Sequence, residues 1–158
     1  IGTKVDLVVS LGAEVKKIPM PHLEGMKLEE AVDAAYSAGF SKVKTEYMET
    51  RAASSGIVIA QSVLEDVSAD PGKEIRLFAA RAPAAATGVE VEGTVELKIG
   101  GEKPTCSVLI RLFDEEGERT VYEQDHSAGE QLAVPVSGIG KTYIKVYLDG
   151  VLAEEKSL

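Results

Sequence analysis

The sequence is poor in cysteine and in aromatic residues. It contains one cysteine, Cys106, and no tryptophan, and 5% of its 158 residues are aromatic. A single cysteine excludes an intrachain disulfide, and its place at the start of an apolar run predicts a small buried side chain. So few aromatic rings argue against a stacking surface for nucleic-acid bases. No segment approaches the roughly 18 consecutive apolar residues that a membrane helix needs.

Acidic residues outnumber basic residues, and the excess differs between the two parts of the chain. The chain has 17 Lys and Arg against 26 Asp and Glu, a net charge of −9. Residues 13–82 are almost balanced, with nine basic and eleven acidic side chains, whereas residues 83–158 have seven and fourteen. The basic patch of a nucleic-acid-binding protein is therefore missing. The surplus of acid in the second half disfavours contact with anionic lipid and favours solubility.

Residue patterns typical of catalysis and metal binding are also missing. There is no Gly-x-Ser-x-Gly elbow, no kinase loop signature and no phosphate-binding glycine loop. His22 and His126 lie far apart, and neither has a second ligand at metal-binding spacing. The acidic residues 114–118 do not fit a calcium loop and are better explained as a charged hairpin tip. The sequence thus predicts no catalytic residues, no metal site and no cofactor.

The chain repeats itself once. Residues 2–10 and 72–80 each consist of a glycine, a short polar pair and apolar residues at alternate positions. This spacing of 70 residues indicates a copied module. Residues 1–12 are accordingly expected to be the closing strand of a preceding, truncated repeat, in a piece of a longer array. Such a strand is expected either to pair with a neighbouring edge or to be poorly ordered.

The second copy predicts one helix packed on a three-stranded sheet, over residues 13–82. Apolar residues at helical spacing predict a helix over 28–38 that stops at Gly39. Lys27 stands where a Ser or Thr cap is expected. Alternating or β-branched segments predict strands at 43–48, 57–61 and 74–79.

The remainder predicts an all-β sandwich. Residues 83–88 are small and uncharged between Pro83 and Gly88, which is typical of a linker. Residues 89–158 show about six short alternating segments separated by turn residues, a spacing typical of a sandwich. Asp149-Gly150 between two such segments is a strong hairpin signal.

The motifs of residues 18–80 resemble the PASTA domain. They comprise the stretch from Met20 to Ala31 with Glu-Glu-Ala entering the helix, the helix exit at Ala38-Gly39-Phe40, the strand Gly56 to Ser62, and the glycine-led strand at Gly72. Two features depart from the family pattern. Lys27 replaces the usual Thr, and the loop from Val63 to Pro71 is longer and acidic. This loop has either acquired another role or is a surface insertion.

The resemblance implies the extracellular region of a bacterial PASTA-type Ser/Thr kinase, on the outer face of the membrane or in the cell wall and anchored upstream. It implies muropeptides or other peptidoglycan fragments as partners, with β-lactams and weak self-association as further options, and a fragment that is not itself an enzyme. An immunoglobulin-like domain after the last repeat resembles the end of some of these kinases. The alternatives are the C-terminal region of a penicillin-binding transpeptidase and an acidic protein-docking β module.

Two arginines are candidate ligand contacts. A peptide ligand would be recognised by the loops and the exposed face of the sheet, and its carboxylate is best gripped by a guanidinium group. Arg51, in the loop before Gly56, is the first candidate, and Arg76 is the second; an ordinary solvated arginine is the alternative for Arg51. Gln61 is expected to be a buried amide that braces the backbone.

Overall fold

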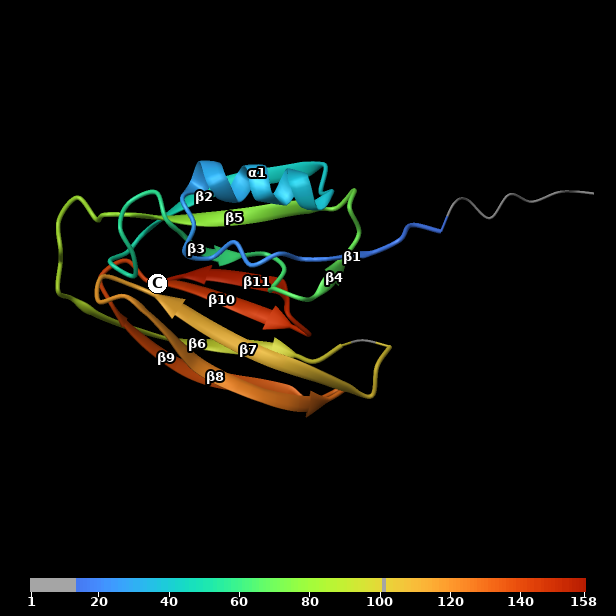
Figure 1. Cartoon of the computed structure of the whole chain (residues 1–158). Helices are drawn as coiled ribbons and strands as arrows, with labels where there is room; N and C mark the ends of the chain where they lie inside the picture. Colours follow the sequence, from blue (N-terminus) through green and yellow to red (C-terminus); the bar gives the residue numbers. More distant parts are fainter. Residues whose placement is uncertain (1–13, 101) are drawn as a thin grey trace, which may run out of the picture.

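A computed structural model describes residues 14–100 and 102–158 (Figure 1). The strand expected within residues 1–12 lies outside the described residues. The first part, residues 14–82 (the helix-bearing half), contains β1 (Ile18–Pro19), α1 (Leu28–Ala38), β2 (Lys42–Glu49), β3 (Val58–Gln61), β4 (Ser68–Ala69) and β5 (Glu74–Arg81). The second part, residues 89–158 (the all-strand half), contains β6 (Glu90–Lys98), β7 (Thr105–Phe113), β8 (Glu118–Ser127), β9 (Gln131–Ile139), β10 (Tyr143–Leu148) and β11 (Val151–Ser157).

Helix α1 has the bounds that the sequence predicts. It ends at Gly39, which adopts the left-handed conformation (φ 107°) and donates its N–H to the carbonyl of Tyr36. At the other end Lys27 has the extended backbone of a cap, but its side chain makes no capping hydrogen bond. The helix is thus held by its buried face, including Ala31 and Ala35, rather than by its first residue.

The sheet under α1 has the order β2-β5-β3. Strand β5 pairs parallel to β2 and antiparallel to β3. Ile75 and Leu77 of β5 point to the helix and form a core with Ala31 and Ala35. The short strands β1 and β4 pair beside this core and anchor the entering chain.

The all-strand half consists of two antiparallel sheets with a common core. The larger has the order β11-β10-β7-β8 and the smaller pairs β6 with β9. Their facing side chains form the second core: Val95, Ile99, Cys106, Val108, Ile110, Leu112, Val134, Val136, Ile144 and Val146. The predicted hairpin joins β10 to β11 through Asp149 (φ 49°) and Gly150 (φ 79°), both in the left-handed region that a two-residue turn of type I′ requires.

The two halves stack into four layers: α1, the sheet β2-β5-β3, the sheet β11-β10-β7-β8 and the sheet β6-β9 (Figure 1). The sheet β11-β10-β7-β8 is consequently covered on both faces. On β7, Ile110 and Leu112 face β9, whereas Arg111 and Phe113 face the helix-bearing half. A third core lies between the halves and contains Met48, Ile59, Ala60, Phe78, Ala80 and Phe113, flanked by Ala52, Ala53, Tyr143 and Leu152.

This third core corrects one expectation. The sequence predicts part of a ligand surface on an exposed face of the sheet β2-β5-β3. Over β5 that face is buried, because Phe78 and Ala80 lie against the all-strand half with 1% or less of their surface exposed. On the same face Lys42 and Lys44 of the edge strand β2 stay exposed. The helix covers the opposite face. Only the loops, the helix surface and the outer edge of the sheet therefore remain open.

Candidate functional site at the junction of the two halves

Arg76 links the two halves. From β5, its Nε and Nη2 donate to the two carboxylate oxygens of Glu46 on β2, at 3.0 and 2.8 Å, and its Nη1 donates to Glu155 on β11. Its guanidinium carbon lies 4.8 Å from the centroid of the Phe78 ring. The hydrogen bonds to Glu46 and Glu155 outweigh partial burial and raise the pKa of Arg76. Three of its five N–H groups are thus already engaged by the two glutamates.

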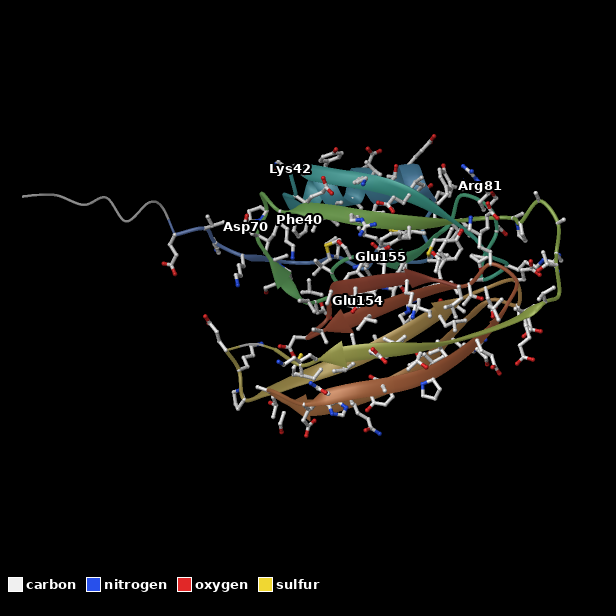
Figure 2. All side chains as sticks on the ribbon, turned by 180° about the vertical axis from the view of Figure 1, so that it is seen from behind. Phe40, Lys42, Asp70, Arg81, Glu154 and Glu155 are labelled. Atoms are coloured by element: carbon white, nitrogen blue, oxygen red, sulfur yellow. The ribbon has the colours of Figure 1, made fainter. Side chains whose placement is uncertain are left out.

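Lys145 extends this set of charges. Its Nζ donates to Glu155 at 2.7 Å and lies 3.2 Å from the centroid of the Phe78 ring, with 2% of the residue exposed. Burial lowers the pKa of Lys145. Burial would raise the pKa of Glu155, but the hydrogen bonds from Arg76 and Lys145 outweigh it, so that this pKa is lowered. Figure 2 shows Glu155 pointing from β11 toward the sheet β2-β5-β3.

Arg111 forms a second link across the junction. Its Nη1 and Nη2 donate to both carboxylate oxygens of Glu24 at 2.7 and 3.1 Å, and Nη2 also donates to the carbonyl of Ile59 at 3.1 Å. Its Nε donates to Glu118 on β8 at 2.7 Å. Burial would lower the pKa of Arg111, but the hydrogen bonds to Glu24 and Glu118 outweigh it and the pKa is raised. Two arginines, one from each half, thus join the halves through charge-assisted hydrogen bonds.

Uncharged contacts complete the junction. The Tyr147 hydroxyl donates to the carbonyl of Gln61 at 3.0 Å. The N–H of Leu152 donates to the carbonyl of Ser62 at 2.7 Å, and that of Leu64 to the carbonyl of Gly150 at 2.8 Å. These two bonds flank an antiparallel bridge between residues 63 and 151. The chain following β3 therefore pairs with the edge strand β11.

The long acidic loop at residues 63–71 has a role in this contact. The turn between β10 and β11 packs so closely on it that a Cβ added at Gly150 would lie 2.6 Å from Cγ2 of Val67. Val67 also accepts a hydrogen bond from the N–H of Met20, which ties the loop to β1. Of the two roles left open by the sequence, the structure shows that this loop is a docking surface for the hairpin.

The side chain of Gln61 braces the backbone beside the same loop. Its Oε1 accepts from the N–H of Leu23 at 3.0 Å, and its Nε2 donates to the carbonyls of Pro21 and Val63 at 3.2 and 2.7 Å. Both ends of the buried amide are thus engaged, in the bracing role expected from the sequence.

The acidic cluster at residues 114–118 also holds backbone. The buried Asp114 carboxylate accepts from the N–H groups of Glu116 and Ile139, at 2.9 and 3.0 Å, and from Arg119. Burial would raise the pKa of Asp114, but these hydrogen bonds lower it. The Asp114 carbonyl accepts from the Thr50 hydroxyl at 2.6 Å. This cluster is therefore a turn that contacts the helix-bearing half.

Glu115 fixes the linker. Its carboxylate accepts from the N–H of Thr87 at 2.9 Å and from that of Gly88 at 3.1 Å. These backbone hydrogen bonds, chiefly that from Thr87, lower the pKa of Glu115, and the charge of Arg51 adds to the effect. The linker is accordingly held against the all-strand half at its second end.

The structure does not bring Arg51 and Arg76 together. Arg51 is exposed in the loop between β2 and β3. The register pairs Lys44 with Arg76, whereas Arg51 lies in the loop two residues beyond Glu49, the last residue of β2. The five strand steps from Lys44 to Glu49 alone span about 17 Å. Arg76 is bound by Glu46 and Glu155, and the charge of Arg51 acts on Glu115 at the linker, so each arginine remains a separate prediction.

A groove of about 270 Å³ opens at the junction beside Arg111. It is lined by His22, Glu24, Gln61, Leu64, Glu65, Leu109, Arg111, Thr120 and Glu123. Its acidic lining disfavours an anionic ligand, since Arg111 is already paired with two glutamates. Every buried side-chain nitrogen or oxygen among residues 14–100 and 102–158 has a hydrogen-bond partner, and these residues contain no group of three potential metal ligands. The charges beside the groove pair with each other across the junction, since Glu24 of one half holds Arg111 of the other.

Sequence reasoning missed the partners at this junction. Arg111 and Lys145 both stand in strands that are otherwise apolar, between Ile110 and Leu112 and between Ile144 and Val146. An unbroken apolar run is typical of a strand buried on both faces. A charged residue in its middle needs a charged or hydrogen-bonding partner. The sequence therefore indicates that Arg111 and Lys145 need partners, but it does not indicate which residues these partners are.

Comparison with known proteins identifies the first half. Residues 18–81 match the family model of the PASTA domain. This segment is a PASTA domain. The match begins at β1 and ends at the last residue of β5, so the PASTA domain includes all six elements of the helix-bearing half. The resemblance seen in the sequence motifs is therefore confirmed.

Other comparisons are more distant. No curated protein matches the chain. A solved structure of the entire extracellular region of the Ser/Thr kinase PrkC from Staphylococcus aureus is similar at 20% identity, with a TM-score of 0.37. The alignment covers 91% of this chain and 52% of that one, so the chain spans about half the length of that structure. In the described part of the chain, α1 is too short and too polar to cross a membrane.

Proposed function

We propose that this chain is the sensor or spacer part of the extracellular region of a bacterial transmembrane Ser/Thr protein kinase, held in or bound to cell-wall peptidoglycan and itself not catalytic. The PASTA domain at residues 18–81 supports this proposal. The observation that carries the spacer role is the sealed junction, in which one sheet face of the PASTA domain lies against the all-strand half. Because the halves cannot rotate against each other without breaking the paired charges and the shared core, the junction fixes the position of one half relative to the other.

The proposal assigns residues 13–82 to a PASTA unit, 83–88 to a linker and 89–158 to an immunoglobulin-like unit, after a strand of a preceding repeat at 1–12. The strand order β11-β10-β7-β8 opposite β6-β9 supports the immunoglobulin-like assignment. It corresponds to the order G-F-C-C′ opposite B-E of that fold. An equivalent for the outer strands A and D is missing from residues 89–100 and 102–158.

Muropeptide binding is proposed for the loops of the PASTA domain. Its sheet face is covered, and Arg76 is engaged by Glu46 and Glu155. Arg51 is exposed and is therefore the first candidate for a ligand carboxylate. Arg76 stays the second, since these two glutamates already hold it.

The test of ligand binding is an NMR titration of the ¹⁵N-labelled chain with soluble muropeptides. We expect chemical-shift changes for the residues around position 51 and little change along β5. Arg51→Gln should weaken binding about tenfold, the loss expected for a charge-assisted hydrogen bond. Lys73→Gln, a matched change of an exposed cation, should not weaken it. If no resonance of residues 18–81 moves, the ligand part of the proposal fails and the spacer part stands.

The spacer part has its own measurement. ¹⁵N relaxation should give one rotational correlation time for the PASTA domain and the all-strand half, because the junction joins them rigidly. Two clearly different correlation times would refute the spacer role, whatever the titration shows.

A further inference from the structure

The outer edge of β2 is open. Among the described residues, β2 pairs with β5 alone, which leaves one side of an eight-residue strand without a partner. Natural proteins usually protect such edges with charged side chains, proline, a bulge or a covering segment. Strand β2 contains no proline and runs in regular register with β5, so its protection consists of charged residues: Lys42, Lys44, Glu46 and Glu49. Figure 2 shows Lys42 at the start of this strand.

We propose that this edge binds the same edge of a second copy of the chain, antiparallel and centred on Thr45. The two three-stranded sheets then become one sheet of six strands with two-fold symmetry. Successive residues of a strand point to opposite faces of the sheet. In the joined sheet, residues that stand opposite each other must therefore come from the same face of each copy. A centre on Thr45 meets this condition: Val43 and Tyr47 lie on its helix side, and Lys44 and Glu46 on the other.

The sequence of β2 is complementary to itself in this register. Lys44 Nζ already lies 3.2 Å from Glu46 Oε1 of its own chain, so the two copies would bring two such pairs together in one cluster of alternating charge. Lys44 stands opposite Glu46 of the second copy, and Val43 stands opposite its Tyr47; each pair occurs twice. Thr45 stands opposite its own equivalent. Opposite charges, aromatic with β-branched residues, and threonine pairs are the favourable cross-strand combinations.

Neighbouring registers are worse. Moving the centre to Glu46 places two glutamates opposite each other, and moving it to Lys44 places two lysines opposite each other. Like charges directly opposite destabilise a strand pair. A centre between two residues, which shifts the register by one, pairs opposite faces. Charge complementarity thus selects both the second copy as occupant and Thr45 as the centre.

The helix adds apolar surface along the same edge. A groove of about 610 Å³ runs between α1 and β2, lined by Leu28, Glu29, Val32, Asp33, Val43 and Thr45. Tyr36, eight residues after Leu28 on the same side of the helix, is 49% exposed, and Tyr47 of β2 is 47% exposed. Two-fold pairing brings both helices to the seam, where Leu28, Val32 and Tyr36 lose contact with water. Glu29 and Asp33 lie along the same groove, and repulsion between these acidic residues of the two copies limits the affinity of the dimer.

Cysteine crosslinking tests the register. In a Cys106→Ser background, Thr45→Cys places two thiols opposite each other on the two-fold axis, within reach of a disulfide or a short bismaleimide. A covalent dimer is expected on a non-reducing gel. Ala133→Cys, exposed on β9, is the matched control and should stay monomeric. A monomeric Thr45→Cys chain under both reagents would mean that the edge is unused or holds another segment, and either result overturns the proposal.

Charge exchange tests the pairing without a crosslink. In sedimentation equilibrium, Lys44→Glu should weaken dimerisation by at least about tenfold, because two attractive pairs become repulsive. Adding Glu46→Lys to it should restore the dimer. Thermal melts check the fold, since Glu46 also holds Arg76. A wild-type chain that stays monomeric, or a double variant that does not recover, contradicts the proposal; neither result depends on muropeptide binding.

Discussion

At the residue scale, the junction depends on charges buried inside apolar strands. Arg111 is 7% exposed and Lys145 is 2% exposed, and both project from the all-strand half toward the PASTA domain. A buried charge is costly unless it is paired. Each of these cations has a carboxylate partner within hydrogen-bonding distance. The residues of the junction therefore stabilise one arrangement of the halves and penalise arrangements that bury these cations without their partners.

Replacing Arg111 tests this argument. Arg111→Met should lower the free energy of unfolding by about 2–3 kcal/mol, because Glu24 and Glu118 lose their partner in a partly buried site. Urea unfolding followed by circular dichroism measures the change. Arg51→Met, at an exposed arginine, is the control and should stay within about 0.5 kcal/mol of the wild type. Equal effects of both variants would show that Arg111 makes no special contribution.

Acid should weaken the junction. The folded-state pKa of Glu155 lies below its ordinary value of 4.5, and that of Glu46 is lowered as well, chiefly by the hydrogen bond from Arg76. Below pH 4.5 the unfolded chain therefore binds more protons than the folded one. The stability that these carboxylates contribute is complete above that pH and declines as pH falls toward the folded pKa values. Glu155→Gln should show a shallower decline between pH 5 and 3 in denaturant titrations; an unchanged slope would contradict this.

At the element scale, local patterns predicted most of the structure. The helix at 28–38 and its stop at Gly39 are confirmed, because apolar spacing and a left-handed glycine are local signals. The Asp149-Gly150 hairpin is confirmed for the same reason. What the sequence did not predict is that β7 and β10 are covered on both faces. Alternation at Val108, Ile110 and Leu112 was enough to assign a strand, but Leu109 and Phe113 between and beyond them indicated a second buried face.

The partners across the junction could not be predicted, for a physical reason. Glu46, Arg76 and Glu155 meet through side chains of three strands from two halves. No spacing rule within one strand contains that information. The candidate site illustrates the same limit: Arg76 was singled out for its chemistry, but its two carboxylate partners are visible only after the layers are stacked.

The hairpin between β10 and β11 provides a test at this scale. Gly150→Ala should destabilise the chain more than Gly129→Ala does, by about 1 kcal/mol or more. Both glycines have positive φ, so both alanines are strained. An alanine methyl group at residue 129 meets open space, whereas one at residue 150 collides with Val67. Thermal melts of both variants measure the difference, and similar losses would show that the loop does not hold the hairpin tightly.

At the scale of the whole molecule, four layers share three cores. The core between the halves includes Phe113 from β7 and Phe78 from β5, each with 1% or less of its surface exposed. The inner sheets of both halves thus lie against each other across a buried contact. The folding of one half is therefore coupled to the presence of the other.

This coupling predicts one cooperative unfolding transition. Tyrosine fluorescence, which reports on both halves, and NMR signals of each half should give the same midpoint. Phe113→Ala should lower stability by about 3–4 kcal/mol, the usual cost of removing a large buried ring, and should separate the two midpoints. Val95→Ala, inside the second core alone, is the control and should leave the transition single. Two transitions in the wild-type chain would refute the coupling.

The ion pairs on the buried face of β5 have an evolutionary consequence. Modules of a tandem array can ordinarily be shuffled, because each presents a generic surface to the next. This module carries Arg76 and Phe78 where Glu155 and Lys145 of the following half require them. Replacing this module with an unrelated one would leave Glu155 and Lys145 buried without these partners. We therefore expect substitutions at these positions to be compatible with the fold only in matched combinations.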